Sequence, residues 1–194
     1  MSDLPLSVPA RVAKAQAIAD RGQFKMSSEP RVGALLRSLV ATKPGGRIIE
    51  VGGGVGVGAG WLLDGMDAEA RLTSIEKHEN FARVLKHVVA DDPRAEVVVA
   101  DATEWLTAYD GPDFDFAFID TTVTKFERRD TLFAHLADGA LVIADDLLPQ
   151  DSWDASHPPR VELFRKEIMQ EPNLVPTLVD WASGLVIAAH RKNA

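Results

Sequence analysis

The chain has 194 residues, no cysteine and a formal net charge of −8 at pH 7, which predicts one domain, residues 1–194, without disulfides or thiolate metal sites. The acidic charge argues against a nucleic-acid partner, because proteins that bind the phosphate backbone usually carry a basic face. The sequence shows no signal-peptide pattern and no apolar run of roughly 20 residues, so we expect a cytoplasmic protein that does not contact a membrane.

Residues 1–45 form an N-terminal segment with helical spacing. Its apolar positions recur at helical intervals: Val32, Leu35, Leu36, Leu39 and Val40. We expect this segment to pack on the rest of the chain or to cover a ligand site.

From Arg47 onward, short β-rich runs alternate with amphipathic segments. The predicted strands are Arg47–Val51, Ala70–Ile75, Glu96–Ala100, Phe114–Ile119 and Ala140–Ala144. The helices expected between them are Ala59–Gly65, Glu79–Ala90, Thr103–Tyr109 and Phe126–Ala137. This alternation predicts right-handed βαβ units, and hence a parallel sheet with helices on both faces.

After Pro149 the pattern changes to one helix, about Pro159–Glu171, and two further strand-like runs. The runs, Val175–Trp181 and Leu185–Ala189, are joined by a short connection, which predicts an antiparallel hairpin. The expected fold is therefore α/β: a single Rossmann-like, doubly wound domain that ends in a hairpin.

A glycine cluster joins the first predicted strand to the helix that follows. Glu50 is followed by Gly52, Gly53, Gly54 and Gly56, an arrangement that brings bare backbone to a ligand at a helix N-terminus. The same stretch contains a GxGxxA match, which alone is a weak dinucleotide signal. An NAD(P)-dependent oxidoreductase therefore stays an alternative, as does a tight turn without a ligand.

When the cluster is counted from Glu50, its Glu-x-Gly-x-Gly-x-Gly pattern resembles motif I of the class I methyltransferases that use S-adenosylmethionine. In that family an acidic residue before the glycines suits the cationic amino-acid moiety of the cofactor. The resemblance implies that Glu50, the four glycines and Val57 bind this cofactor, and it covers about residues 26–194.

Two further acidic residues follow predicted strands. Glu76 lies 24 residues after Gly52, where a carboxylate accepts the ribose hydroxyls, although it also suits the start of a helix. Asp101 resembles the methyltransferase residue that meets the adenine amino group, with Ala102 adding a backbone contact. Asp101 also fits a capping box with Glu104. Lys77 completes the predicted cofactor site.

The stretch Gly139–Leu148 resembles the catechol/caffeoyl-CoA-type small-molecule O-methyltransferases. In that family, strand-end acids and amides hold a divalent cation that orients the substrate hydroxyl. The resemblance implies that Asp120, Asp145 and Asp146 bind Mg²⁺ or another divalent cation. The chain departs from the family pattern at Asp146, which replaces an asparagine, and at Lys125, which lies five residues after Asp120 instead of three. The alternative is that Asp120 lines the cofactor pocket and that Asp145 and Asp146 cap the next loop.

Two residues are candidates for handling the proton of the acceptor, and Asp120 is expected to act beside them. Lys125 is the first candidate if burial depresses its pKa, although a lysine in a charged helix is more often solvated. His157 is the second, and it lies in a polar segment with Trp153, residues 150–159, that we expect to form a lid.

Together these resemblances imply S-adenosylmethionine-dependent methyl transfer to an oxygen of a small-molecule acceptor. They also imply a seven-stranded sheet with six parallel strands and one antiparallel strand. A non-catalytic S-adenosylmethionine-binding module is a further alternative. Because relatives of this type often dimerise through N-terminal helices and a sheet edge, we expect a homodimer.

Overall fold

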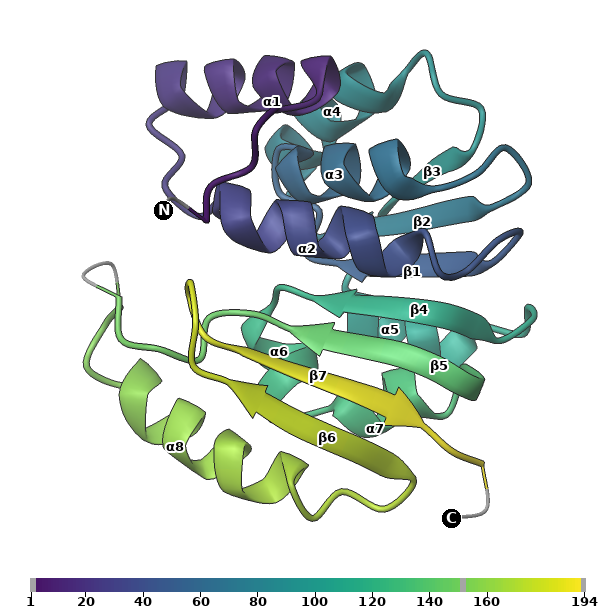
Figure 1. Cartoon of the computed structure of the whole chain (residues 1–194), viewed down its shortest axis with the longest axis vertical. Coiled ribbons are helices and arrows are strands. Elements are labelled where there is room, and N and C mark those ends of the chain that lie inside the picture. The colour runs from purple at the N-terminus through teal and green to yellow at the C-terminus, as the bar shows by residue number, and fades with distance from the viewer. Residues whose placement is uncertain (1–2, 151–152, 193–194) are drawn as a thin grey trace.

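The structure is a computed structural model that describes residues 3–150 and 153–192. Its seven strands form one sheet in the order β3-β2-β1-β4-β5-β7-β6 (Figure 1). Their bounds are β1 Arg47–Val51, β2 Arg71–Glu76, β3 Ala95–Val99, β4 Phe114–Ile119, β5 Leu136–Ala144, β6 Leu174–Val179 and β7 Leu185–His190. Strands β1 to β5 pair in parallel, and β7 runs antiparallel to both β5 and β6. The predicted doubly wound sheet with a terminal hairpin is confirmed.

Helices cover both faces of the sheet. Their bounds are α1 Ala10–Arg21, α2 Pro30–Val40, α3 Val57–Gly65, α4 Glu79–Val89, α5 Ala102–Ala108, α6 Thr122–Phe126, α7 Arg129–Phe133 and α8 His157–Ile168. Helices α1 to α4 form one apolar layer with the sheet and α5 to α8 form the other (Figure 1). Within residues 3–150 and 153–192, no helix is long and apolar enough to span a membrane.

Successive side chains of the central strands enter opposite layers of the core. Ile48 packs in the layer of α1 to α4, and Ile49 packs in the layer of α5 to α8. In β4, Phe118 packs in the layer of α1 to α4 and Ile119 packs in the layer of α5 to α8. Strands buried on both faces read as continuous apolar runs instead of alternating ones, which explains why these runs were visible in the sequence.

The N-terminal helices pack closely against α3. Val12, Ala15 and Ala19 of α1 are buried, and Gly33 of α2 lies so close to the indole of Trp61 that a Cβ atom at residue 33 would clash with it.

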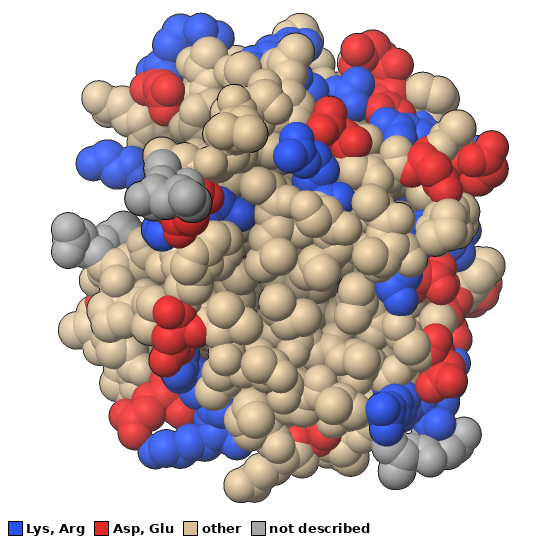
Figure 2. All heavy atoms as spheres, viewed as in Figure 1, with Lys and Arg blue, Asp and Glu red and all other residues tan. Residues whose placement is uncertain are grey.

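In the view of Figure 1, charged side chains gather around the rim of the molecule and the centre of this face carries few of them (Figure 2).

The predicted helix over Phe126–Ala137 is wrong. Helix α6 ends at Phe126, only the short helix α7 follows within the segment, and β5 begins at Leu136, which pairs with Phe114. The chain leaves the helical path at Arg128, with φ of −130°, and Arg129 turns toward Glu167 and Glu171 of α8 at 2.9 and 2.7 Å. These long-range partners outweigh the local helical pattern.

Candidate active site

The turns that follow neighbouring parallel strands meet at the carboxyl edge of the sheet. The amide of Asp120, after β4, donates to the carbonyl of Val51 at 2.8 Å. Gly52 has a φ of +98°, and a Cβ atom on it would lie 2.5 Å from the carbonyl oxygen of Asp120. Only glycine fits this conformation and this approach, so the glycine turn and the turn at Asp120 are in direct contact.

Glu50 lies beneath the glycine turn and is only 1% exposed. Its carboxylate accepts a hydrogen bond from the hydroxyl of Ser74, and Gly58 packs directly against it. Burial raises the pKa of Glu50 to about 7; the bond from Ser74 opposes this shift and the charge of Glu76 adds to it. A cation that reached this carboxylate would favour its ionised form.

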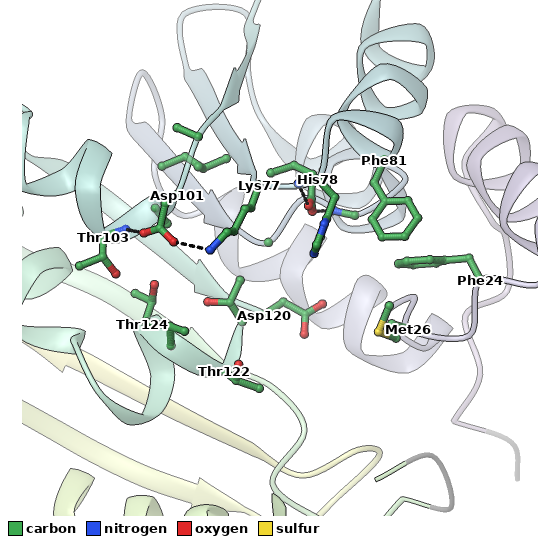
Figure 3. A pocket seen from close by; sticks show the side chains of 18 residues that line it. Phe24, Met26, Lys77, His78, Phe81, Asp101, Thr103, Asp120, Thr122 and Thr124 are labelled. Atoms are coloured by element: carbon green, nitrogen blue, oxygen red, sulfur yellow. Dashed lines mark hydrogen bonds and ion pairs between the residues drawn. The ribbon is translucent and has the colours of Figure 1, made fainter. Parts of the chain in front are cut away.

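A first cavity of about 320 Å³ lies over the ends of β1 to β4 (Figure 3). Glu76 lies at its wall and accepts hydrogen bonds from the amides of Gly54 and His78, at 2.8 and 2.7 Å. Phe24 and Phe81 border the cavity, and their rings pack edge to face at 4.9 Å. The cavity thus combines an acidic wall with an apolar one.

Asp101 lies at the far end of this cavity (Figure 3). Its carboxylate accepts hydrogen bonds from the amides of Thr103 and Glu104 at 3.0 and 3.3 Å and pairs with Lys77 at 2.9 Å. The hydrogen bond from Lys77 lowers the pKa of Asp101. The predicted capping role is therefore observed, and Ala102, the first residue of α5, borders the same cavity.

A second cavity of about 290 Å³ adjoins the first. The two share Met26, Asp120, Thr121 and Thr122. The second cavity is further bordered by Lys125, Asp145, Asp146, Trp153 and His157.

His157 faces this second cavity from the start of α8. Its ring lies 4.3 Å from that of Trp153, and its Nε2 atom is buried without a hydrogen-bond partner among the described residues. Burial lowers the pKa of His157, and the nearby positive charge of Lys125 adds to this shift. A neutral imidazole with a free ring nitrogen can accept a proton. Asp151 and Ser152 of the predicted lid lie outside the described residues.

A third, small cavity of about 10 Å³ shares lining residues with each of these two cavities. It is bordered by Glu50, by Gly52, Gly53 and Gly54, by Val57 and Gly58, by Asp120, and by Phe24, Met26, Ser27 and Ser28. Gly56 instead is the N-cap residue of α3 and packs against Leu85 and Val88. The predicted cofactor residues therefore gather in one region. Gly56 borders none of the three cavities and contributes only to the shape of the glycine turn.

The predicted metal ligands have other partners. Asp145 is 2% exposed, and its Oδ1 atom accepts hydrogen bonds from the hydroxyl of Ser183 and the amide of Asp146. Asp146 accepts one from Gln150 at 3.2 Å. Burial raises the pKa of Asp145 to about 6 and that of Asp120 well above its ordinary value, and the neighbouring carboxylates add to both shifts.

In the described parts of the chain, no group of three or more histidine, aspartate or glutamate side chains is arranged to hold a metal ion. A lysine takes a place among the carboxylates. Lys125 is 2% exposed and donates a hydrogen bond to the backbone carbonyl of Asp145. Of the two alternatives for Lys125, the solvated one does not hold, because α6 turns the side chain inward.

Several site residues were not visible in the sequence. Ser74 and Ser183 hold Glu50 and Asp145, and Phe24 and Met26 border the first cavity. A single serine carries no recognisable pattern, and residues 22–29 connect α1 to α2 without helical or strand periodicity. The only signal was the expectation that the N-terminal segment covers a site.

Comparison with known proteins identifies the class. Residues 49–147 match the family model described as a methyltransferase domain, and the chain belongs to this family. The glycine turn, Glu76 and Asp120 all lie within the matched region. The match confirms the resemblance to methyltransferases and favours it over the oxidoreductase alternative.

Individual relatives agree with this family. A Mycobacterium marinum protein that bears an O-methyltransferase name is 35% identical over 171 residues, which cover 82% of this chain and 75% of that protein. The fold is also that of the O-methyltransferase TomG from Streptomyces achromogenes in complex with SAM, with a TM-score of 0.85 at 20% identity over 98% of this chain and 94% of the other. An O-methyltransferase from Bacillus cereus in complex with SAH gives a TM-score of 0.84 at 20% identity over the same shares.

Proposed function

We propose that this protein transfers a methyl group from S-adenosylmethionine to an oxygen of a small-molecule acceptor. The observation that carries the proposal is the pair of adjoining cavities that meet at Asp120. A reaction between two bound molecules needs two sites with a shared border, and most of its rate gain can come from holding the reactants in line. The O-methyltransferase names of the relatives support the same chemistry.

The first cavity suits the nucleoside part of the cofactor. Glu76 can accept both ribose hydroxyls, Asp101 can accept from the adenine amino group, and Lys77 and Ala102 border the same end. Thr103 Oγ1 and Thr121 Oγ1 border this cavity and are buried without partners among the described residues, so they are free to bond a polar ligand. When bound, the cofactor supplies a methyl group on a positively charged sulfur.

The small third cavity suits the amino-acid part of the cofactor. Glu50 and the glycine turn border it, and a buried carboxylate next to bare amides can receive an ammonium and a carboxylate group. At about 10 Å³ it holds roughly one water molecule. The segment with Phe24 and Met26 must therefore shift when the cofactor binds.

The second cavity suits the acceptor. The indole of Trp153 offers a flat wall, and Nε2 of His157 lies free to accept the hydroxyl proton. Asp120 borders both reactants. The carboxylates do not fit a divalent cation, because Asp145 is bonded to Ser183 and Lys125 lies among them. No step is therefore assigned to a cation.

Calorimetry tests this proposal. Titration with S-adenosylmethionine and S-adenosylhomocysteine should give micromolar binding, and NADH should give none. A screen of hydroxylated acceptors with radiolabelled methyl donor should then find an O-methylated product. NADH binding without S-adenosylmethionine binding would overturn the proposal, and tight cofactor binding without any product would favour a non-catalytic binding module.

We further propose that two copies associate through the face shown in Figure 2. Leu35 and Leu39 of α2 and Leu141 and Ile187 of the sheet are only half-buried, and the centre of this face carries few charges. Apolar surface of this kind is typical of contacts between subunits. Light scattering after size exclusion should give twice the monomer mass of 21.1 kDa, and a monomer mass at micromolar concentration would contradict the proposal.

A further inference from the structure

Lys125 is a buried cation fixed at the border of the acceptor cavity. It lies on α6, whose first turn follows Asp120 directly, and its amide donates to the carbonyl of Thr121 at 3.3 Å. Its ammonium group donates to the carbonyl of Asp145 and lies 5.5 Å from the ring centre of Phe126. Arg160 covers the same ring at 4.9 Å. These contacts hold one positive charge beside the cavity.

The same contacts place this charge where the resemblance implied a divalent ion. Lys125 reaches the strand end that carries Asp145 and Asp146, and it borders the second cavity together with Asp120. Oδ1 of Asp145 is saturated by Ser183 and the amide of Asp146, two donors that belong to the fold. A metal ion bound at this oxygen would have to displace these donors, and it would lie near the ammonium group of Lys125, an arrangement that costs electrostatic energy.

We propose that Lys125 supplies the positive charge of the acceptor site and that methyl transfer in this protein proceeds without a divalent cation. This inference rests on the proposed methyl transfer. The acceptor oxygen forms a bond to the methyl carbon, the carbon–sulfur bond breaks and leaves its electron pair on sulfur, and the hydroxyl proton passes to Nε2 of His157. The ammonium of Lys125 stabilises the negative charge that develops on the acceptor oxygen.

The substrate class follows from this arrangement. A divalent ion can bind two neighbouring hydroxyl groups of an acceptor at once. A single ammonium group at the cavity wall binds only one acceptor oxygen. The acceptor is therefore a small planar molecule with a single acidic hydroxyl, such as a simple phenol, whose ring packs on Trp153. A cavity of about 290 Å³ is at the small end of ligand pockets, which limits the acceptor to about one or two rings.

Binding of Mn²⁺ tests the inference without a turnover assay. The complete protein, with saturating S-adenosylhomocysteine, is titrated with Mn²⁺ and free ion is followed by electron paramagnetic resonance. We expect no binding at micromolar concentrations. One Mn²⁺ bound per chain at such concentrations would overturn the inference, whatever the acceptor.

Turnover of matched acceptors gives the second test. A phenol and the corresponding catechol are compared with EDTA and with Mg²⁺, and the rates should agree within about threefold. Lys125→Met should lower kcat/KM by about 10²- to 10³-fold, as loss of an oxyanion donor does, with unchanged affinity for S-adenosylhomocysteine. Lys125→Arg, which keeps the charge, should lose less, and Lys166→Met on the exposed face of α8 should change nothing.

The outcomes separate the two proposals. Loss of turnover in EDTA with recovery in Mg²⁺ would overturn the inference and leave the methyltransferase proposal standing. Equal turnover by Lys125→Met and the unmodified protein would do the same. A protein that methylates no hydroxylated acceptor would refute the proposed function, and the Mn²⁺ titration would still decide whether the carboxylates hold a cation. If Lys125→Met fails to fold, Lys125→Arg and the EDTA comparison carry the test.

Discussion

Replacing Glu50 with glutamine removes a carboxylate from the most deeply buried part of the cofactor site. In the unfolded chain this group ionises near its ordinary pKa of 4.5, whereas burial raises its native pKa to about 7. An acid with a raised native pKa contributes its full stability below pH 4.5, and that stability is lost as the pH rises through 7. At about 1.36 kcal/mol per pKa unit, the loss is about 3 kcal/mol by pH 8.

The Glu50→Gln variant does not ionise and does not incur this loss. Its amide oxygen can still accept the hydrogen bond from Ser74. The free energy of unfolding should therefore exceed that of the unmodified protein by about 3 kcal/mol at pH 8, and the difference should shrink to under about 1 kcal/mol at pH 5. Urea unfolding at both pH values measures this. Glu69→Gln, an exposed change, should show no such pH dependence.

Cofactor binding should respond in the opposite direction. An ionised Glu50 can pair with the ammonium group of the cofactor, and a charge-assisted hydrogen bond contributes about 1.5–3 kcal/mol. At pH 8, Glu50→Gln should therefore weaken S-adenosylhomocysteine binding by about 10- to 100-fold. A variant that is no more stable than the unmodified protein at pH 8, or that binds the ligand equally well, would refute the assigned role of Glu50.

Three further substitutions test the packing and the acceptor site. Ser183→Ala removes the hydroxyl that bonds Asp145 and should lower stability in urea by about 1–3 kcal/mol; an unchanged midpoint would show that this bond contributes nothing. Gly33→Ala places a methyl group against Trp61 and should lower stability by about 1–3 kcal/mol. A melting temperature equal to that of the unmodified protein would contradict this prediction. His157→Gln should lower kcat/KM by about 10²- to 10⁴-fold with unchanged cofactor affinity, since it removes the proton acceptor; full activity would exclude that role.

The fold was largely predictable because its signals are local. The central strands are buried on both sides, so each reads as a continuous apolar run between turn residues. The error at Phe126–Ala137 has the opposite cause. The segment has helical spacing, but Leu136 pairs with Phe114 and Arg129 pairs with α8, and neither partner can be identified from the segment itself.

The site likewise contains residues that could be predicted from the sequence and residues that could not. Glu50, Glu76 and Asp101 lie at or just beyond the carboxyl ends of β1, β2 and β3, and parallel strands bring these ends to one edge, so their proximity could be inferred from the sequence. The burial of Lys125 could not be inferred, because a short helix beside charged residues looks solvated in sequence. Its hydrogen bond to Asp145 depends on where α6 lies after β4, which is a property of the folded chain.

Asp120 links the cofactor and acceptor halves of the site. It borders all three cavities, and its backbone contacts the turn at Gly52 on one side while α6, with Lys125, begins two residues later. Met26 borders the same three cavities, so the shift of its segment on cofactor binding also changes the wall of the acceptor cavity. Closely packed residues of this kind do not deform gradually. The acceptor pocket should accordingly reach its working geometry only when the cofactor is bound, which favours an order of binding with the cofactor first.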